Sequence, residues 1–302
     1  MTKIGLLLPT REAVIYGDES GDPRPLVDLA IRAEDLGFDS VWAGDSLLAR
    51  PRAEPLTLLA GVATQTSDIE LGTAVLLPSL RNPEQLAQAT ATLDALSGGR
   101  FILGVGAGPG TPLVKTDHEF VGADFDKRAS RSVEVLRRTQ SLWRGDGDQM
   151  FPLPGTDEGP PIWMGASGPR NLQRAGAYCD GWFPTATSPE MFRSGLAKVR
   201  EAAQQAGRSS NDITAAVYLT VVIDEPEAAQ LALAEHSLLY YGVPHGKVAK
   251  NQGSLAGDID DVGEWLLSFI EAGAEHLCIR VGSKEMNDQL ETLATMLDEL
   301  RR

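Results

Sequence analysis

The sequence is poor in the residues that most often bind metals or form covalent intermediates. Its 302 residues include two cysteines, Cys179 and Cys278, and four histidines. Cys278 lies in an apolar run and Cys179 precedes an Asp-Gly pair, so we expect both to pack as small buried side chains. Neither has a second cysteine or a histidine at metal-ligand spacing, which argues against a zinc site and a disulfide framework. We therefore expect no bound metal and a reducing, cytoplasmic location.

Positive charge and long apolar runs are also scarce. The 42 acidic residues outnumber the 27 lysines and arginines, and the formal net charge is -15. Such a chain disfavours nucleic acid or an anionic membrane surface as a partner, although the start of a helix can still attract a small anion. The longest apolar run, residues 215–223, is too short to cross a bilayer. The expected partner is a small-molecule substrate, with no nucleic acid and no membrane.

What the chain does contain is a regular alternation of strand and helix patterns. Eight short apolar segments, each followed by a segment of helical periodicity, predict parallel strands joined by right-handed crossovers. The expected fold class is α/β, a (β/α)8 TIM barrel with an inserted segment after strand four, forming a single domain over residues 1–302. An open doubly wound sheet is the alternative. The expected strands cover residues 3–9, 39–45, 69–77, 101–105, 161–166, 181–184, 213–223 and 276–282.

The expected strand ends carry unusually small side chains. Ligands of such barrels bind at the carboxyl ends of the strands, and strand four runs directly into Gly106-Ala107-Gly108. Bare backbone there leaves room for a flat ligand, although a tight turn explains any single glycine more simply. The strand ends hold no histidine, cysteine or lysine, which argues against a metal-dependent hydrolase, a Schiff-base aldolase and a cysteine nucleophile. Three long segments, at 10–25, 109–126 and 144–160, are expected to be irregular and to form the substrate mouth.

Two other strand ends are candidates for specific roles. Asp45 is the one carboxylate at an expected strand end; it can contact a ligand or move a proton, or it can cap the following segment, and both alternatives stay open. Gly165 to Asn171 combines a strand end with a helix expected from Pro169. Its free amides and the helix dipole suit a phosphate, whereas a plain helix start with proline is the simpler alternative.

Other residues are less informative. Residues 104–110 depart from the dinucleotide-binding glycine fingerprint, so a Rossmann fold is rejected. Arg280 either faces the site or braces a loop. Three tryptophans, Trp42, Trp163 and Trp182, are expected in the core and not in contact with a cofactor.

Four motifs, in this order and spacing, resemble the bacterial luciferase-like family of flavin- or deazaflavin-dependent oxidoreductases. They are AEDLGFDSVW at 33–42, LGTAV at 71–75, LDALSGGR at 93–100 leading into GVG at 104–106, and GASG at 165–168. The resemblance covers essentially the whole chain and implies a (β/α)8 barrel that binds coenzyme F-420, slightly favoured, or FMN. Members of the family often form homodimers, but no helix face in the sequence assigns one here.

The resemblance also implies site residues. A non-proline cis peptide is expected behind the central ring of the cofactor, at Ala74–Val75, and Asp45 is expected to contact the cofactor and to be the catalytic residue. The cofactor-binding residues implied are Asp45, Ala74, Val75, Leu77, Gly106, Ala107, Gly108, Gly165, Ala166, Ser167, Gly168, Arg170 and Asn171.

The sequence departs from one branch of the family. Sugar-phosphate dehydrogenases that it resembles carry a histidine just after the strand-two aspartate and a glutamate just after the strand-four glycines, where this chain has Ser46 and Pro109. That activity is therefore disfavoured. The function expected is an oxidoreductase of the luciferase-like monooxygenase family that transfers hydride from the reduced cofactor to a small organic substrate, or oxygenates it. A non-catalytic flavin-binding relative is the alternative, and a cofactor-free hydrolase or isomerase is a remoter one.

Overall fold

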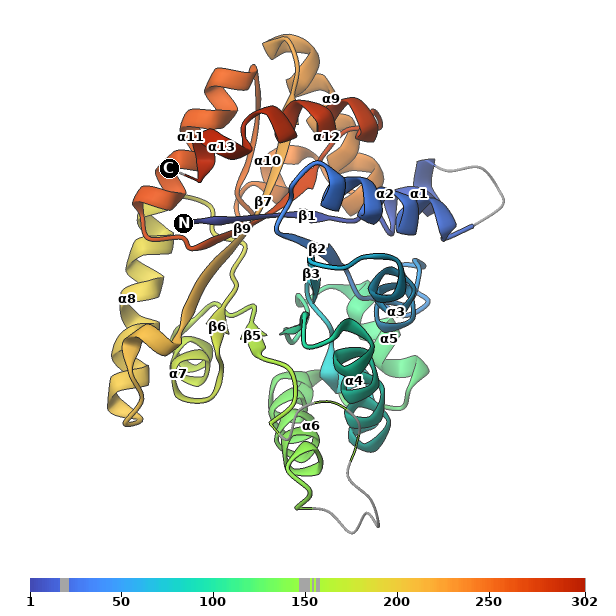
Figure 1. The fold of residues 1–302 in the computed structure, drawn as a ribbon, viewed down its shortest axis with the longest axis vertical. Helices are drawn as coiled ribbons and strands as arrows, with labels where there is room; N and C mark the ends of the chain where they lie inside the picture. Colours follow the sequence, from blue (N-terminus) through green and yellow to red (C-terminus); the bar gives the residue numbers. More distant parts are fainter. Residues whose placement is uncertain (17–21, 147–152, 154, 156–157, 302) are drawn as a thin grey trace.

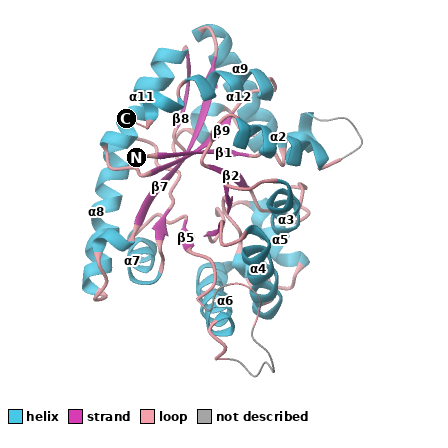
Figure 2. Ribbon diagram, viewed as in Figure 1, coloured by secondary structure: helices cyan, strands magenta, loops and turns pink. Residues whose placement is uncertain are grey.

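Eight parallel strands close into a barrel, and helices cover its outer wall (Figures 1 and 2). The computed structural model describes residues 1–16, 22–146, 153, 155 and 158–301. Around the barrel the strands pair in the order β1-β2-β3-β4-β5-β6-β7-β9, and β9 returns to β1. This closure confirms the TIM barrel and excludes the open sheet. The strands are β1 (Lys3–Leu7), β2 (Ser40–Ala43), β3 (Glu70–Thr73), β4 (Phe101–Val105), β5 (Ile162–Met164), β6 (Gly181–Trp182), β7 (Thr214–Ile223), β8 (Ser254–Gly257) and β9 (His276–Val281).

The helices begin and end where local chemistry favours it. Proline is the first residue of α3, α4, α5, α7, α8 and α9, a position where its missing amide hydrogen costs nothing. Asn82 caps α4 by accepting a hydrogen bond from the Gln85 amide, and Gly98 ends this helix in the left-handed conformation. The helices are α1 (Glu12–Tyr16), α2 (Arg24–Asp35), α3 (Pro55–Gln65), α4 (Pro83–Ser97), α5 (Pro112–Phe120), α6 (Arg128–Trp143), α7 (Pro169–Tyr178), α8 (Pro189–Gln205), α9 (Pro226–Tyr241), α10 (His245–Val248), α11 (Ile259–Glu271), α12 (Met286–Thr295) and α13 (Leu297–Leu300).

Two segments expected to be irregular contain helices. The segment 10–25 holds α1 and the first residues of α2, and the segment 109–126 holds α5. Both expectations were wrong because five- and nine-residue helices are too short to show a clear apolar period. The third segment, 144–160, falls largely outside the described residues.

A ninth strand, β8, was missed by the sequence patterns. It pairs with residues 220–223 of β7, beyond the part of β7 that pairs with β6. The ten-residue β7 is longer than the barrel wall at that point, so its far end needs a partner for its backbone groups. The chain therefore runs from β7 through α9 and α10 to β8, which pairs with the far end of β7, and then continues into α11. The chain ends in two helices, α12 and α13, where one was expected.

The floor of the barrel is aromatic. Trp42 is completely buried, with its ring centroid 5.3 Å from that of Trp163 and 4.9 Å from that of Phe183. Its indole nitrogen donates to the Ser40 hydroxyl at 2.7 Å, and the hydroxyl also bonds the His276 ring at 2.7 Å. Trp163 and Trp182 are buried as well, which confirms the expectation that the three tryptophans belong to the core.

Two buried histidines are expected to make the fold sensitive to acid. Burial lowers the pKa of both His276 and His236 from 6.5 to about 3, and the nearby Arg280 contributes at His236. As the pH falls from 6.5 to about 3, only the unfolded chain takes up these protons, so each histidine costs about 1.4 kcal/mol of stability per pH unit. We expect the free energy of unfolding of His276→Asn, measured with urea, to fall by about 1.4 kcal/mol less per pH unit than that of the parent protein between about pH 6 and about pH 4. Parallel curves for the two proteins would contradict this.

Cys179 and Cys278 are free and buried, and burial raises the pKa of the Cys179 thiol to about 12. No described helix combines the length and the apolarity needed to span a membrane. Within the described ranges, no three histidine, cysteine or acidic side chains converge as metal ligands.

Candidate active site

The carboxyl ends of β3, β4 and β5 come together around one side chain, Val75. The amide of Leu76 donates to the Gly104 carbonyl at 2.8 Å, and the Gly106 amide donates back to Leu76 at 3.0 Å. A β-carbon at Gly106 would lie 2.7 Å from Val75 Cγ2, and one at Gly165 would lie 3.3 Å from Val75 Cγ1. The Val75 side chain therefore packs over both glycines, and Ala74, Val75 and Gly165 are partly exposed around the buried Gly106. We call these four residues the cradle.

The strand expected over residues 69–77 ends early because the backbone turns at the cradle. β3 stops at Thr73, and the peptide bond between Ala74 and Val75 is cis, which confirms the expectation drawn from the family resemblance. Leu76 then forms an isolated bridge with Val105. Ala107 and Gly108, which follow β4 and Gly106 in the chain, are partly exposed.

The start of α7 offers free donors next to β5. Gly168 has φ = +80°, a backbone conformation suited to glycine, and its carbonyl accepts from the amides of Asn171 and Leu172. No described residue accepts a hydrogen bond from the backbone amides of Ser167, Gly168 or Arg170. Ser167, Gly168 and Arg170 are exposed. This arrangement suits an anion at the helix start, and binding of a phosphate there stays a prediction.

Two further residues from the predicted set have structural contacts here. Ala166 is buried, and its carbonyl accepts a hydrogen bond from the Trp182 indole at 3.0 Å. The Asn171 side chain donates to the Ser167 carbonyl at 3.3 Å and accepts from Arg174 at 3.0 Å. These contacts hold the turn between β5 and α7 in place.

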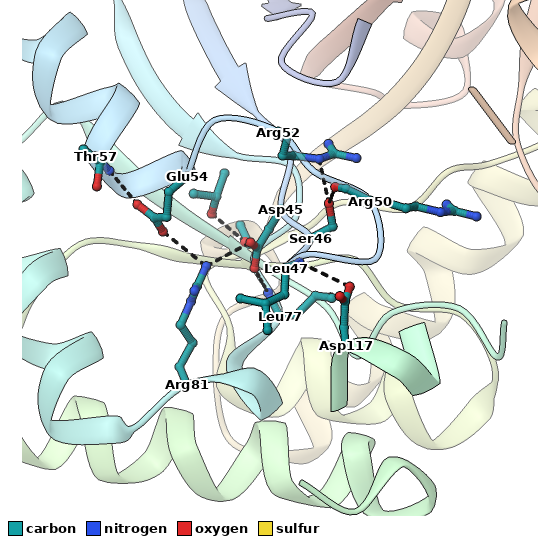
Figure 3. A network of polar contacts seen from close by, with 12 residues as sticks. Asp45, Ser46, Leu47, Arg50, Arg52, Glu54, Thr57, Leu77, Arg81 and Asp117 are labelled. Atoms are coloured by element: carbon teal, nitrogen blue, oxygen red, sulfur yellow. Dashed lines mark hydrogen bonds and ion pairs between the residues drawn. The ribbon is translucent and has the colours of Figure 1, made fainter. Parts of the chain in front are cut away.

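Asp45 lies at the end of β2 and braces the turn after the cradle (Figure 3). Its carboxylate accepts from the Leu77 amide and from the Arg81 guanidinium, each at 2.9 Å, and its side chain is only 2% exposed. Arg81 also reaches Glu54 at 3.3 Å. Burial raises the pKa of Asp45, while Arg81 and the Leu77 amide oppose the rise. Asp45 thus positions Leu77, the residue that leads into the short 3-10 turn Pro78–Leu80; its contact with a cofactor and its catalytic role stay predictions.

The loop after Asp45 is tied down by its own polar contacts (Figure 3). The Ser46 hydroxyl donates to the Arg50 carbonyl and accepts from Arg52 Nε at 2.9 Å. Asp117, buried on α5, accepts from the amides of Leu47 at 3.2 Å and Ala49 at 2.9 Å. The hydroxyl of Ser46 is therefore committed to the loop.

A group of arginine and tyrosine side chains at the barrel mouth was missed. Arg280, at the end of β9, donates to the hydroxyls of Tyr240 and Tyr241, both at 2.6 Å, and Arg52 donates to Tyr240 at 3.1 Å. Arg280 thus does both things that the sequence left open: it lies at the mouth and it braces α9. The sequence holds no signal for this group, because its contacts join the loop after β2, the end of α9 and the end of β9, which lie far apart in the chain.

Comparisons with known proteins agree with this geometry. A family model described as luciferase-like monooxygenase matches residues 2–276. The F420-dependent glucose-6-phosphate dehydrogenase of Nocardia farcinica is 31% identical over 299 residues, which cover 86% of this chain and 88% of that protein. The phthiodiolone/phenolphthiodiolone dimycocerosates ketoreductase of Mycobacterium bovis is 32% identical over 252 residues, covering 69% of this chain and 64% of that protein.

A solved structure supports the fold independently. The F420-dependent secondary alcohol dehydrogenase, in complex with an F420-acetone adduct, superposes with a TM-score of 0.81 over 100% of this chain and 99% of that one, at 22% identity. The likeness at that identity concerns the barrel alone. Because the family model covers most of the sequence and one relative above 30% identity covers most of its length, the chain belongs to the luciferase-like monooxygenase family and is a flavin- or F420-dependent oxidoreductase.

Proposed function

We propose that the chain uses coenzyme F-420 to exchange a hydride with the carbonyl or alcohol carbon of a small organic substrate. The observation that carries this proposal is the combination of a cradle of small, partly exposed residues at the ends of β3 to β5 with free amides at the start of α7. The names of two of the proteins compared above include F420, which favours the deazaflavin. The names of the three describe an alcohol dehydrogenase, a ketoreductase and a sugar-phosphate dehydrogenase, which favours a carbonyl or alcohol carbon as the reacting group.

The cradle residues fit a planar ring. Ala74, Val75 and Gly165 form a partly exposed surface of small side chains, which a flat heterocycle can approach closely. When bound, reduced coenzyme F-420 supplies a hydride to the substrate carbon. The chain holds the ring against the cradle, with Leu77, Ala107 and Gly108 around it. Asp45 braces this wall and is our candidate for the group that exchanges the accompanying proton.

The phosphate of the cofactor would bind at the start of α7. Ser167, Gly168 and Arg170 present free amides, and Arg170 adds a guanidinium. Ala166 and Asn171 support the same turn through their hydrogen bonds.

A cationic groove beyond α7 favours coenzyme F-420 over FMN. It lies between α6 and α7, has a volume of about 690 Å³, and is lined by Arg137, Arg170, Arg174 and Tyr178 among others. Glu134 is the carboxylate in this lining. FMN ends at its phosphate, whereas coenzyme F-420 continues into an acidic oligoglutamate tail. Three arginines next to the phosphate position therefore match the longer, more acidic cofactor.

We expect Arg137→Gln to weaken binding of coenzyme F-420 about threefold, because one exposed cation contributes less than about 1 kcal/mol. Arg137 packs on Tyr178 and, among the described residues, makes no hydrogen bond to those proposed to bind the phosphate, so binding of the tailless deazaflavin should not change. The control is Arg193→Gln, an exposed arginine on α8. Fluorescence titration measures both ligands. An equal loss for the tailless compound would show that the groove does not bind the tail.

The substrate of the Nocardia relative is not proposed for this chain. The Ser46 hydroxyl is bonded to Arg50 and Arg52, and the exposed Pro109 has no proton to exchange. The acid–base pair that the family's sugar-phosphate dehydrogenases carry at these two positions is thus replaced.

The proposed function is tested by mixing the protein with reduced coenzyme F-420 and a panel of aldehydes, ketones and oxo acids without oxygen. We expect the absorbance of the oxidised deazaflavin to appear only when both protein and a carbonyl compound are present. Gly168→Asp is the inactive control. If reduced FMN with oxygen gave an oxygenated product while reduced coenzyme F-420 was never oxidised, the proposal would be wrong.

A further inference from the structure

Three guanidinium groups surround one phenol ring at the barrel mouth. The Cζ atoms of Arg280, Arg11 and Arg52 lie 4.0, 4.6 and 5.9 Å from the centroid of the Tyr240 ring. The three arginines come from three separate places: the end of β9, the residue before α1, and the loop after β2. We call them the arginine cluster.

The cluster has little compensating negative charge. Arg280 is 5% exposed and is paired with the buried Glu12 at 3.5 Å. No carboxylate of the described residues lies within ion-pair distance of Arg11 or Arg52. Asp45, which is near Arg52, has its carboxylate bonded to Arg81 and to a backbone amide. Arg11 and Arg52 are partly exposed, but holding three guanidinium groups around one ring with a single carboxylate is unfavourable unless another anion joins them.

Two buried guanidinium nitrogens of the cluster, Arg280 Nε and Arg11 Nη1, make no hydrogen bond in the described structure. Glu12 Oε1, the ion-pair partner of Arg280 Nε at 3.5 Å, makes none either, so Arg11 Nη1 is the donor of the cluster with no described acceptor near it. The hydroxyl of Tyr218, whose ring lies 5.3 Å from Arg280 Cζ, is also buried without a hydrogen-bond partner. Buried donors in native proteins are almost always bonded. Unused donors that surround a concentration of positive charge are the arrangement expected for a site that receives an anionic oxygen group.

The cluster borders the cradle. Arg52 packs against the bare backbone of Gly44 at the end of β2, so closely that a side chain at Gly44 would collide with its guanidinium. The same position at Gly44 is 3.7 Å from the carbonyl oxygen of Ala74. A group held by Arg52 is therefore next to the wall on which the proposed function places the cofactor ring.

We propose that the arginine cluster binds a carboxylate or phosphate group of the substrate, so that this oxidoreductase acts on a small organic anion. The proposal rests on the proposed function for the position of the reacting carbon, and on the cluster for the charge of the substrate. Planar guanidinium groups recognise both kinds of anion through paired hydrogen bonds. In the described structure Glu12 is the carboxylate paired with the cluster, and the Tyr240 oxygen accepts hydrogen bonds from two of its guanidinium groups.

Tyr240 provides a spectroscopic reporter for the site. Burial by itself would raise its pKa, but Arg280 and Arg52 outweigh burial and lower the pKa of this phenol. Its oxygen accepts hydrogen bonds from both guanidiniums. An anion that enters the cluster shares these cations and so makes the phenolate less favourable. The other charged or titratable groups around Tyr240 are Arg11, Glu12, His236, Tyr218 and Tyr241.

The test is calorimetric titration of the cofactor-free protein with malonate and, separately, with inorganic phosphate. We expect saturable binding that Arg11→Gln and Arg52→Gln each weaken about tenfold or more, since each removes a charged hydrogen-bond donor. Arg170→Gln is the matched control, because it acts on the phosphate position at α7 and leaves the cluster intact. Circular dichroism of the Arg11→Gln variant without anion checks that it is folded, since the change removes the contact of the guanidinium with the Tyr240 ring.

The second readout is ultraviolet titration of tyrosinate, assigned with Tyr240→Phe. Saturating malonate should move the Tyr240 midpoint to higher pH, an effect that a purely structural cluster would not produce. The proposal is overturned if neither anion binds, if Arg170→Gln alone abolishes binding, or if the midpoint does not move. Binding of coenzyme F-420 is measured on the same samples: its loss with intact malonate binding would reject the proposed cofactor and leave the anion site standing.

Discussion

Replacing Gly168 by aspartate is expected to weaken binding of coenzyme F-420 at least about 100-fold. The carboxylate would lie among the free amides at the start of α7 and take the position of the cofactor phosphate. Two like charges about 4 Å apart near a protein surface repel by about 4 kcal/mol, which is more than enough for a 100-fold effect. The measurement is fluorescence titration of each protein with the cofactor.

The matched control for this change is Gly168→Ala. Gly168 has φ = +80°, so any other residue strains the backbone there, but a β-carbon would meet no atom within 4 Å. Alanine thus carries the backbone cost of aspartate without its charge, and we expect a loss several times smaller. Equal affinities for the two variants would show that no anionic group binds at this helix start.

Replacing Trp42 by alanine is expected to destabilise the fold by about 3–5 kcal/mol. The side chain is completely buried at the floor of the barrel, in contact with Trp163, Phe183 and His276. Removing it leaves a cavity between strands that cannot move together, because each is bonded to its neighbours around a closed barrel. The hydrogen bond from its indole to Ser40 is lost as well.

Urea unfolding followed by circular dichroism measures this effect, with Trp42→Phe as the control. Phenylalanine keeps most of the volume but not the hydrogen bond to Ser40, so we expect about a third of the loss seen for alanine. A loss below about 1 kcal/mol for Trp42→Ala would mean that the barrel floor is not the tightly packed core described here.

Much of the barrel could be predicted from the sequence, because its long helices have clear apolar periods and proline at their first position. The helix expected from Pro169 begins at that residue in the structure. The misses share one physical cause: α1, α5 and β8 have four to nine residues, and such short segments depend on tertiary contacts more than on local pattern. β3 ended early because the backbone turns at the cis bond after Ala74.

One part of the candidate site could be predicted from the sequence and another part could not. The cradle and the α7 start lie at strand ends, which a barrel always brings together, so residues such as Gly106, Gly165 and Gly168 could be named without a structure. The arginine cluster could not be predicted, since Arg52 meets Tyr240 across 188 positions of sequence. Polar contacts between loops carry no periodic signal in the sequence.

The most direct measurement is a pair of equilibrium binding isotherms, one for coenzyme F-420 and one for FMN, on the same preparation. We predict saturable binding of one coenzyme F-420 per chain, with FMN at least about tenfold weaker and competing for the same site. Tighter binding of FMN, or no saturable binding of the deazaflavin, would contradict the proposal that the cradle and the start of α7 together hold this cofactor.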